Sequence, residues 1–118
     1  KDEIYQYKPG TFVGGDEIRV LISLDLSKSQ TMSPLDRNAG LKKQYTEGGR
    51  YVPVSWLRKF EGGRVFYTNL GHNESTFWNP AVIKHYLDGL QYALGDLAAD
   101  ATPSSKIKRS AVLAPAKP

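Results

Sequence analysis

The sequence predicts an α/β fold in which a central sheet, part of it a β-hairpin, is covered by one long helix towards the C-terminal end. Three observations lead to this fold class: a nearly continuous apolar run, two strand-like segments joined by a glycine turn, and an amphipathic segment with clear helix-end signals. The chain has 118 residues, 40% of them hydrophobic and 24% charged, so we expect one domain with a modest core.

The first expected element is the segment 17–27, EIRVLISLDLS, which is rich in β-branched and aliphatic residues. A middle that is almost continuously apolar is typical of a strand buried on both faces, so we predict that this segment is the central strand. The stretch that follows, 27–49, contains many small polar and charged residues with little periodicity. It is therefore predicted to be a long loop.

Two further strands are expected at 51–60, YVPVSWLRKF, and in RVFYTNL at 64–70, with EGG between them. This arrangement predicts an antiparallel hairpin in which Gly62 and Gly63 supply the positive φ angles of the turn. Pro53 has no backbone N–H to donate, so we expect it at an edge of the sheet or at a bulge.

The helix is predicted within WNPAVIKHYLDGLQYALGD, residues 78–96. Asn79 is a favourable N-cap, Pro80 suits the first helical position, and Gly95 lies where helices commonly end. Apolar residues at spacings of three and four form a stripe that is expected to pack on the sheet; its members are Ile83, Tyr86, Leu87, Leu90 and Leu94. His85 lies off this stripe, which indicates either solvent exposure or a packing role.

Charge divides the chain into a neutral body and a basic tail. Residues 1–100 carry twelve basic and twelve acidic side chains, whereas 101–118 carry four basic side chains and no acid. We therefore predict a domain at 1–100 and an extended Pro/Ala-rich tail at 101–118. The tail contains no aromatic residue, which argues against a nucleic-acid interface, because such interfaces place base-contacting groups beside the basic ones.

The basic residues of the tail are candidates for binding a protein partner; they are Lys106, Lys108 and Arg109. An extended arm of this kind can order on a partner, and deleting it should then release the partner without changing the unfolding transition of the domain. Docking on an acidic membrane surface and a simple solvated terminus are the alternatives. No run approaches the roughly 20 apolar residues of a transmembrane helix.

The chain contains no cysteine, which excludes disulfides, thiolate metal sites and a cysteine nucleophile. Its two histidines, 13 residues apart, do not have the spacing of a metal site, so neither a metal nor another cofactor is expected. Since the sequence begins at Lys1, we expect that an initiator, a signal or an upstream region was removed or left out.

The segment 53–96 resembles the C-terminal part of ThuA-like domains, the trehalose-utilisation family, whose fold is similar to that of class I glutamine amidotransferases. The resemblance is carried by PVSW, GGRVFYTNLGH and HYLDGLQYALG, and it extends more weakly upstream through DEIYQY and RVLISLDLSK. It implies a partial amidotransferase-like sandwich, because ThuA-like domains usually have a first half with further parallel strands and crossover helices. The chain is then either a fragment or a shortened protein.

The resemblance also implies a site at GHNE, directly after the second hairpin strand. In the amidotransferases a histidine there takes the proton of a cysteine nucleophile, and a glutamate two residues later orients the imidazole. His72 and Glu74 have this spacing and are the catalytic candidates, but without a cysteine the thiol chemistry does not transfer. His72 would act as a general base or polar contact for a sugar; the ligand-binding candidates beside it are Asn69, Asn73 and Tyr67.

Each candidate also has a structural explanation. His72 can bond a backbone carbonyl, Glu74 can lie near the N-terminus of the 80–94 helix, where the dipole favours an acid, and Tyr67 can belong to the core. Two functions therefore remain open: utilisation of a disaccharide or keto-sugar, or a non-catalytic accessory subunit that docks through an exposed sheet and the basic tail. A periplasmic or secreted location is favoured over the cytoplasm by the resemblance and the lack of cysteine.

Overall fold

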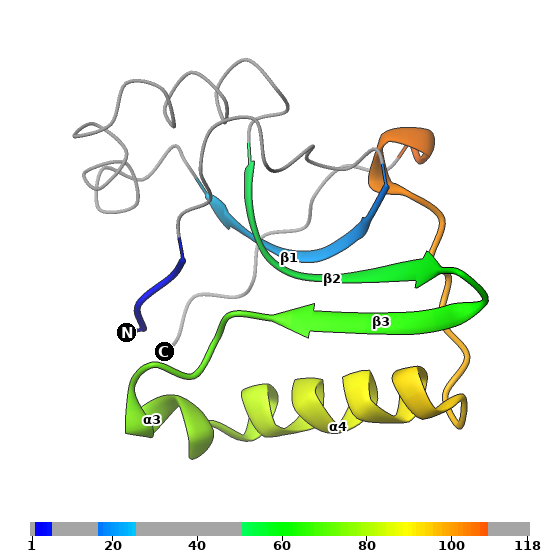
Figure 1. The fold of residues 1–118 in the computed structure, drawn as a ribbon. Coiled ribbons are helices and arrows are strands. Elements are labelled where there is room, and N and C mark those ends of the chain that lie inside the picture. Colours follow the sequence, from blue (N-terminus) through cyan, green and yellow to red (C-terminus); the bar gives the residue numbers. More distant parts are fainter. Residues whose placement is uncertain (1, 6–16, 26–50, 109–118) are drawn as a thin grey trace.

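The computed structural model describes residues 2–5, 17–25 and 51–108, and these form an α/β arrangement with a three-stranded antiparallel sheet (Figure 1). The elements are β1 (Arg19–Asp25), β2 (Tyr51–Phe60), β3 (Gly63–Thr68), α3 (Glu74–Phe77), α4 (Pro80–Leu94) and the 3₁₀ helix η1 (Ser104–Lys106). The predicted fold class is confirmed: a hairpin and one long helix packed on the sheet, compatible with a partial sandwich. The predicted loop at 27–49 lies outside the described residues.

The hairpin of β2 and β3 is confirmed, but its turn is shifted by one residue. The two strands pair from Ser55 opposite Thr68 to Phe60 opposite Gly63. The left-handed angles belong to Glu61, with φ 48°, and Gly62, with φ 81°, so Gly63 does not take part as predicted. Two consecutive positive φ values are typical of a two-residue turn whose twist matches that of the strands.

The strand order is β1-β2-β3, so β2 is the central strand and β1 is not. The prediction of a central β1 buried on both faces is wrong, since Leu21 is 43% and Ile22 36% exposed. The buried positions lie mainly in β2, where Val52, Val54 and Leu57 are at most 3% exposed. An apolar run identifies a strand, but the order of strands depends on which segments pair with it.

Pro53 lies in the central strand, at a bulge. The register between β1 and β2 shifts between Ile22 and Ser23, and Ser23 is the partner of Pro53. Pairing with β3 begins only at Ser55, so Pro53 lies in the part of β2 that β3 does not flank. The missing N–H therefore removes no bond from the β2-β3 ladder, and the prediction of a bulge is confirmed.

The ends of α4 are those predicted. The side chain of Asn79 accepts a hydrogen bond from the backbone N–H of Ala81 at 3.0 Å, and Pro80 is the first helical residue. At the other end Gly95 has φ 99° and donates its N–H to the carbonyls of Gln91 and Tyr92. A left-handed glycine that satisfies the last free carbonyls is a common way for a helix to stop.

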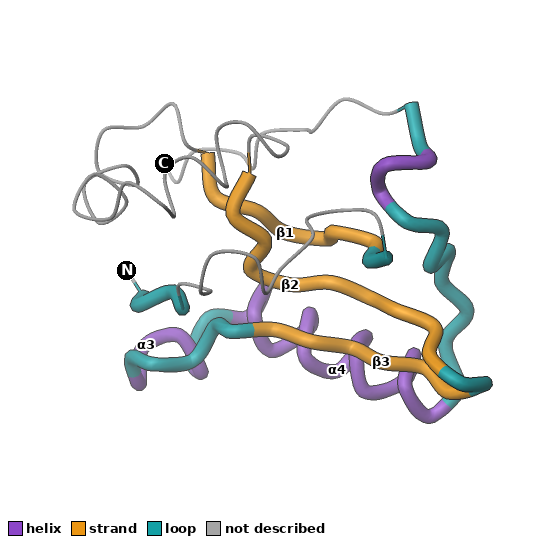
Figure 2. Tube along the Cα trace, turned by 45° about the horizontal axis from the view of Figure 1, so that its top comes forward, coloured by secondary structure: helices purple, strands orange, loops and turns teal. Residues whose placement is uncertain are grey.

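The face that α4 turns to the sheet is not the predicted one. Leu87 is 54% and Leu90 59% exposed, and the stripe is completed by the exposed side chains of Ile83 and Leu94. Of the predicted stripe, Tyr86 alone is half-buried. Instead, Gly89 and Tyr92 are the buried residues of α4, which lies along β3 in both views (Figures 1 and 2).

Close contact between α4 and β3 depends on Gly89. A side chain at this position would overlap the ring of Phe66 on β3, so a glycine is needed for the helix to lie this near the sheet. Helical periodicity locates two opposite faces of α4 but not the one that meets β3. The face of α4 that contains Gly89 packs on β3, because the Phe66 ring occupies the space where a side chain at position 89 would lie.

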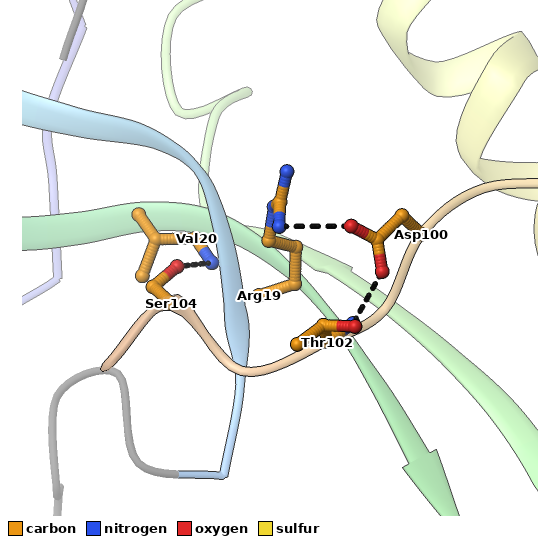
Figure 3. A network of polar contacts seen from close by, with 5 residues as sticks. All are labelled: Arg19, Val20, Asp100, Thr102 and Ser104. Atoms are coloured by element: carbon orange, nitrogen blue, oxygen red, sulfur yellow. Dashed lines mark hydrogen bonds and ion pairs between the residues drawn. The ribbon is translucent and has the colours of Figure 1, made fainter. Parts of the chain in front are cut away.

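The segment that follows α4 runs beside the start of β1 from Asp100 to Ser104, where η1 begins (Figure 3). The backbone N–H of Ser104 donates to the carbonyl of Ile18 at 2.9 Å, and its hydroxyl accepts from the N–H of Val20 at 2.8 Å. Arg19 forms an ion pair with Asp100 at 3.2 Å. The first part of the segment that charge assigns to the tail is thus bonded to the sheet.

Candidate functional site

The loop after β3 runs close to the N-terminal segment 2–5 (Figure 2). A small cavity lies where the two meet. Its volume is about 290 Å³, and it is lined by Tyr5, Thr68, Asn69, Leu70, Gly71 and His72. Two of the predicted site residues, Asn69 and His72, are therefore on its wall. The cavity lies at the carboxyl end of β3, where GHNE was predicted to form a site.

The loop turns sharply at Gly71, which has φ 119°. A Cβ there would lie 2.9 Å from the Phe77 ring and 3.0 Å from the hydroxyl of Tyr86, so only glycine fits both the angle and the space. The Tyr86 hydroxyl donates to the carbonyl of Leu70 at 2.9 Å. Two helices thus hold the loop in place, α3 through Phe77 and α4 through Tyr86.

Asp2 bonds the same loop from the N-terminal side. Its carboxylate accepts from the backbone N–H of Gly71 at 2.7 Å and from that of Asn73 at 2.9 Å, and the Asn73 amide reaches it at 3.3 Å. Burial raises the pKa of Asp2, but hydrogen bonds from Gly71, Asn73, the backbone of Glu3 and the side chain of Thr76 outweigh it and lower the pKa to about 2. Asp2 is therefore ionised at neutral pH.

His72 has a carboxylate neighbour, and it is Glu3. The distance from His72 Nε2 to Glu3 Oε2 is 3.2 Å, with the two side chains 59% and 71% exposed. Glu74, the predicted partner, is instead the exposed first residue of α3. The structural explanation expected Glu74 at the N-terminus of the 80–94 helix, whereas Glu74 begins the separate helix α3, and the first turn of α4 contains no acid.

Asn69 is the most deeply buried polar residue of the cavity wall. It is 6% exposed, and within the described part of the chain neither its Oδ1 nor its Nδ2 has a hydrogen-bond partner. Its backbone N–H donates to the carbonyl of Val54 at 3.0 Å, which fixes the position of the residue. A buried amide left unpaired costs roughly 1–3 kcal/mol, so its presence calls for an explanation.

Tyr67 and Asn73 do not line the cavity. The ring of Tyr67 stacks on that of Trp56, its cross-strand partner, with centroids 3.8 Å apart and planes 18° from parallel. Asn73 contacts Asp2, as described above, and is exposed. Both residues support the surroundings of the cavity by these contacts.

His85 is a packing residue at the interface of α4 and the sheet. Its Nε2 lies 2.8 Å from Ser55 Oγ, and its ring meets Phe66 edge-on with centroids 5.2 Å apart. Burial lowers the pKa of His85, partly offset by the charge of Asp88. Of the two alternatives predicted for His85, the packing role is the one observed.

A serine next to a histidine can form a nucleophile-base pair, but Ser55 and His85 do not have that arrangement. Ser55 is 0% exposed, and its hydroxyl donates to the carbonyl of Tyr67 at 2.7 Å. Since a hydroxyl has one proton, its oxygen must accept from His85 Nε2–H. The pair therefore joins helix to sheet and is closed to a substrate.

The basic tail residues are described only in part. Lys106 ends η1 and Lys108 follows it, both with exposed side chains, while Arg109 lies outside the described residues. In the ranges that the structure describes, no three side chains are grouped as metal ligands. Nor does any described helix have the length and apolar character needed to cross a membrane.

The sequence analysis missed Asp2, Glu3 and Tyr5 as parts of the site. A signal was present, because DEIYQY belongs to the weaker upstream part of the resemblance. Nothing in the spacing showed that this segment meets a loop about 70 residues further along the chain. That contact depends on the tertiary fold.

Comparison with known proteins gives one match. The family model ThuA, described as trehalose utilisation, matches residues 1–93, which is most of the chain and includes every residue of the cavity wall. No curated protein and no solved structure matches the chain significantly.

Proposed function

Because the chain belongs to the trehalose-utilisation (ThuA) family, we propose that it serves carbohydrate utilisation by binding a disaccharide or keto-sugar in the cavity at the end of β3. The cavity is near the lower limit of roughly 300–1,000 Å³ for small-molecule pockets. It has room for part of a sugar, so the remainder of a disaccharide would extend over the exposed surface around His72.

The observation that carries this proposal is the buried, unpaired amide of Asn69. A sugar hydroxyl both donates and accepts hydrogen bonds, and an amide offers one donor group and one acceptor side by side. Both atoms are shielded in the structure, so the side chain would turn towards the cavity, where two neighbouring hydroxyls of a sugar would satisfy Nδ2 and Oδ1. A ligand of this class would remove the cost of leaving the amide without a partner.

His72 gives the proposed site a titratable group beside the bound sugar. With its ring at the cavity wall, it can accept a proton from a sugar hydroxyl or donate one to a sugar oxygen. The chain has no cysteine, so a thiol-based acyl or glutamine transfer is excluded. The proposed chemistry is therefore proton transfer to or from a hydroxyl or carbonyl group.

The alternative, an accessory subunit that docks through its exposed sheet and the basic tail, is not better supported. The outer edge of β1 is occupied at its start, where Ser104 bonds the backbone of Ile18 and Val20. An edge occupied in this way is poorly placed to receive a strand from a partner.

Substitution of Asn69 tests the proposal. Asn69→Leu removes both polar atoms at similar volume, so the protein should remain folded with an equal or higher midpoint of unfolding. Calorimetric titration with trehalose, other disaccharides and keto-sugars should show binding by the wild type and at least about tenfold weaker binding by the variant, the cost of losing one to two hydrogen bonds. Gln91→Leu, an amide removed from α4 outside the cavity, is the matched control.

Two results would overturn the proposal. One is that the wild type binds no sugar of the panel, so that adding each sugar leaves its backbone resonances for 69–72 unchanged. The other is equal affinity for the wild type and Asn69→Leu.

A further inference from the structure

We propose that Asp2 and Glu3 are positioning residues of this site, Glu3 as the carboxylate that orients His72 and Asp2 as the anchor of the backbone on either side of it. The inference rests on the proposed function for the role of His72 towards a sugar. The positions of Asp2 and Glu3 beside the His72 loop follow from their own contacts and do not depend on that function.

Asp2 holds the two peptide N–H groups that flank His72. One belongs to Gly71, at 2.7 Å, and the other to Asn73, at 2.9 Å, so one carboxylate fixes the chain before and after the histidine. Bonds from a neutral N–H to a carboxylate are shorter and stronger than those between neutral groups. The position of His72 is therefore set by a residue outside its own loop.

This anchoring matters because the loop has a backbone conformation that needs support. Gly71 adopts φ 119°, and its surroundings leave no room for a Cβ. The Gly71 N–H has Asp2 as its partner, and without that partner the group would lose its bond in a partly buried position. Asp2 thus stabilises the loop conformation in which His72 lines the cavity.

Glu3 acts on the histidine ring rather than on the backbone. Its carboxylate lies 3.2 Å from His72 Nε2, so Nε2 points to Glu3 and Nδ1 is the ring nitrogen left for a ligand. The contact fixes which way the ring faces, as the carboxylate of a catalytic triad orients its imidazole. Glu74 has the expected sequence spacing, but it is the exposed first residue of α3, and the carboxylate observed beside His72 is that of Glu3.

Nuclear magnetic resonance on the full chain tests both placements without any ligand. In Asp2→Asn, the amides of Gly71 and Asn73 should exchange hydrogen at least about tenfold faster than in the wild type, because each loses a charge-assisted bond. The amides of β3 and α4 should keep their rates. In Glu3→Ala, the Nε2 resonance of His72 should move while the amides on either side of it keep their exchange rates. Glu74→Ala is the matched control and should change neither signal.

Calorimetric titration with the sugar panel of the preceding section then measures the effect on binding. Asp2→Asn and Glu3→Ala should each weaken binding at least about threefold, and Glu74→Ala should leave it unchanged. If the wild type binds no sugar but the resonance changes occur as expected, the proposed function fails and the placement of Asp2 and Glu3 stands. The inference is overturned if Glu74→Ala, and not Glu3→Ala, moves the His72 resonance, or if Asp2→Asn leaves both amides unchanged.

Discussion

Gly89 shows how a single residue decides the contact of a helix with a sheet. The ring of Phe66 fills the space that a side chain at position 89 would occupy. The sequence gives a hint of this, because a glycine in the middle of a helix is unfavourable and needs a packing reason. It could not name Phe66 as that reason, since the two residues belong to different elements.

Gly89→Ala should therefore lower the free energy of unfolding, although alanine has the better helix propensity. The gain in propensity is about 1 kcal/mol, and the overlap with the Phe66 ring should exceed it, giving a net loss of roughly 1–2 kcal/mol. Urea denaturation followed by circular dichroism measures the change. Adding Phe66→Leu to Gly89→Ala should recover part of the loss, and stabilisation by Gly89→Ala alone would contradict the observed packing.

Asp2 makes a second prediction at this scale, on the pH dependence of stability. Its pKa falls from the ordinary value of 3.8 to about 2 on folding, so its contribution is complete above pH 4 and is lost as the pH falls to about 2. Because the carboxyl is near solvent, we expect only about 1 kcal/mol after screening. Unfolding measured at pH 7 and pH 3 should show a smaller difference for Asp2→Asn than for the wild type. Equal differences for both proteins would rule out this role of Asp2.

Among the elements, α4 was predicted best at its ends and worst in its orientation. Asn79, Pro80 and Gly95 act locally, so their roles follow from the sequence. The orientation depends on which residues of β2 and β3 meet the helix, and there Ser55 and Phe66 take His85 and Gly89 as partners. For the same reason β1 was recognised as a strand, but its place in the sheet was not.

The two faces of α4 should respond very differently to substitution. Leu87→Gln and Leu90→Gln alter exposed side chains, so each should change the free energy of unfolding by no more than about 0.5 kcal/mol. Tyr92→Ala removes a ring that is 3% exposed and should cost roughly 3–5 kcal/mol. Chemical denaturation of the three variants measures both effects. A large loss for the leucine variants would mean that the predicted stripe does face the sheet.

For the molecule as a whole, the segment after α4 belongs to the fold as far as residue 107. Its contacts with Ile18, Arg19 and Val20 flank the edge of β1 at the start of the strand. Charge counting assigned 101–118 to a tail, and it did not reveal the bonds of Ser104 to the sheet, because the count is sensitive to composition and not to backbone hydrogen bonds. In the same way, the sequence identified the loop that carries His72 but not the N-terminal segment that completes the cavity.

Truncation tests this view of the edge. A chain that ends at Asp100 should unfold at lower urea concentration than one that ends at Lys108, and it should self-associate more, because an uncovered edge strand can pair with another copy. Denaturation and size-exclusion chromatography measure the two effects. Identical behaviour of both chains would instead support the expectation that deleting the tail leaves the unfolding transition unchanged.

The contact between Asp2 and Gly71 spans 69 positions of the chain, and that between Val20 and Ser104 spans 84. The β2-β3 hairpin and α4, in contrast, join neighbouring segments, so they can form early, whereas closing long loops is slow. On a ribosome the N-terminal residues must wait until the loop at 71–73 has emerged before they can bind it. We therefore expect the cavity to be completed late in folding, after the hairpin and helix that support it.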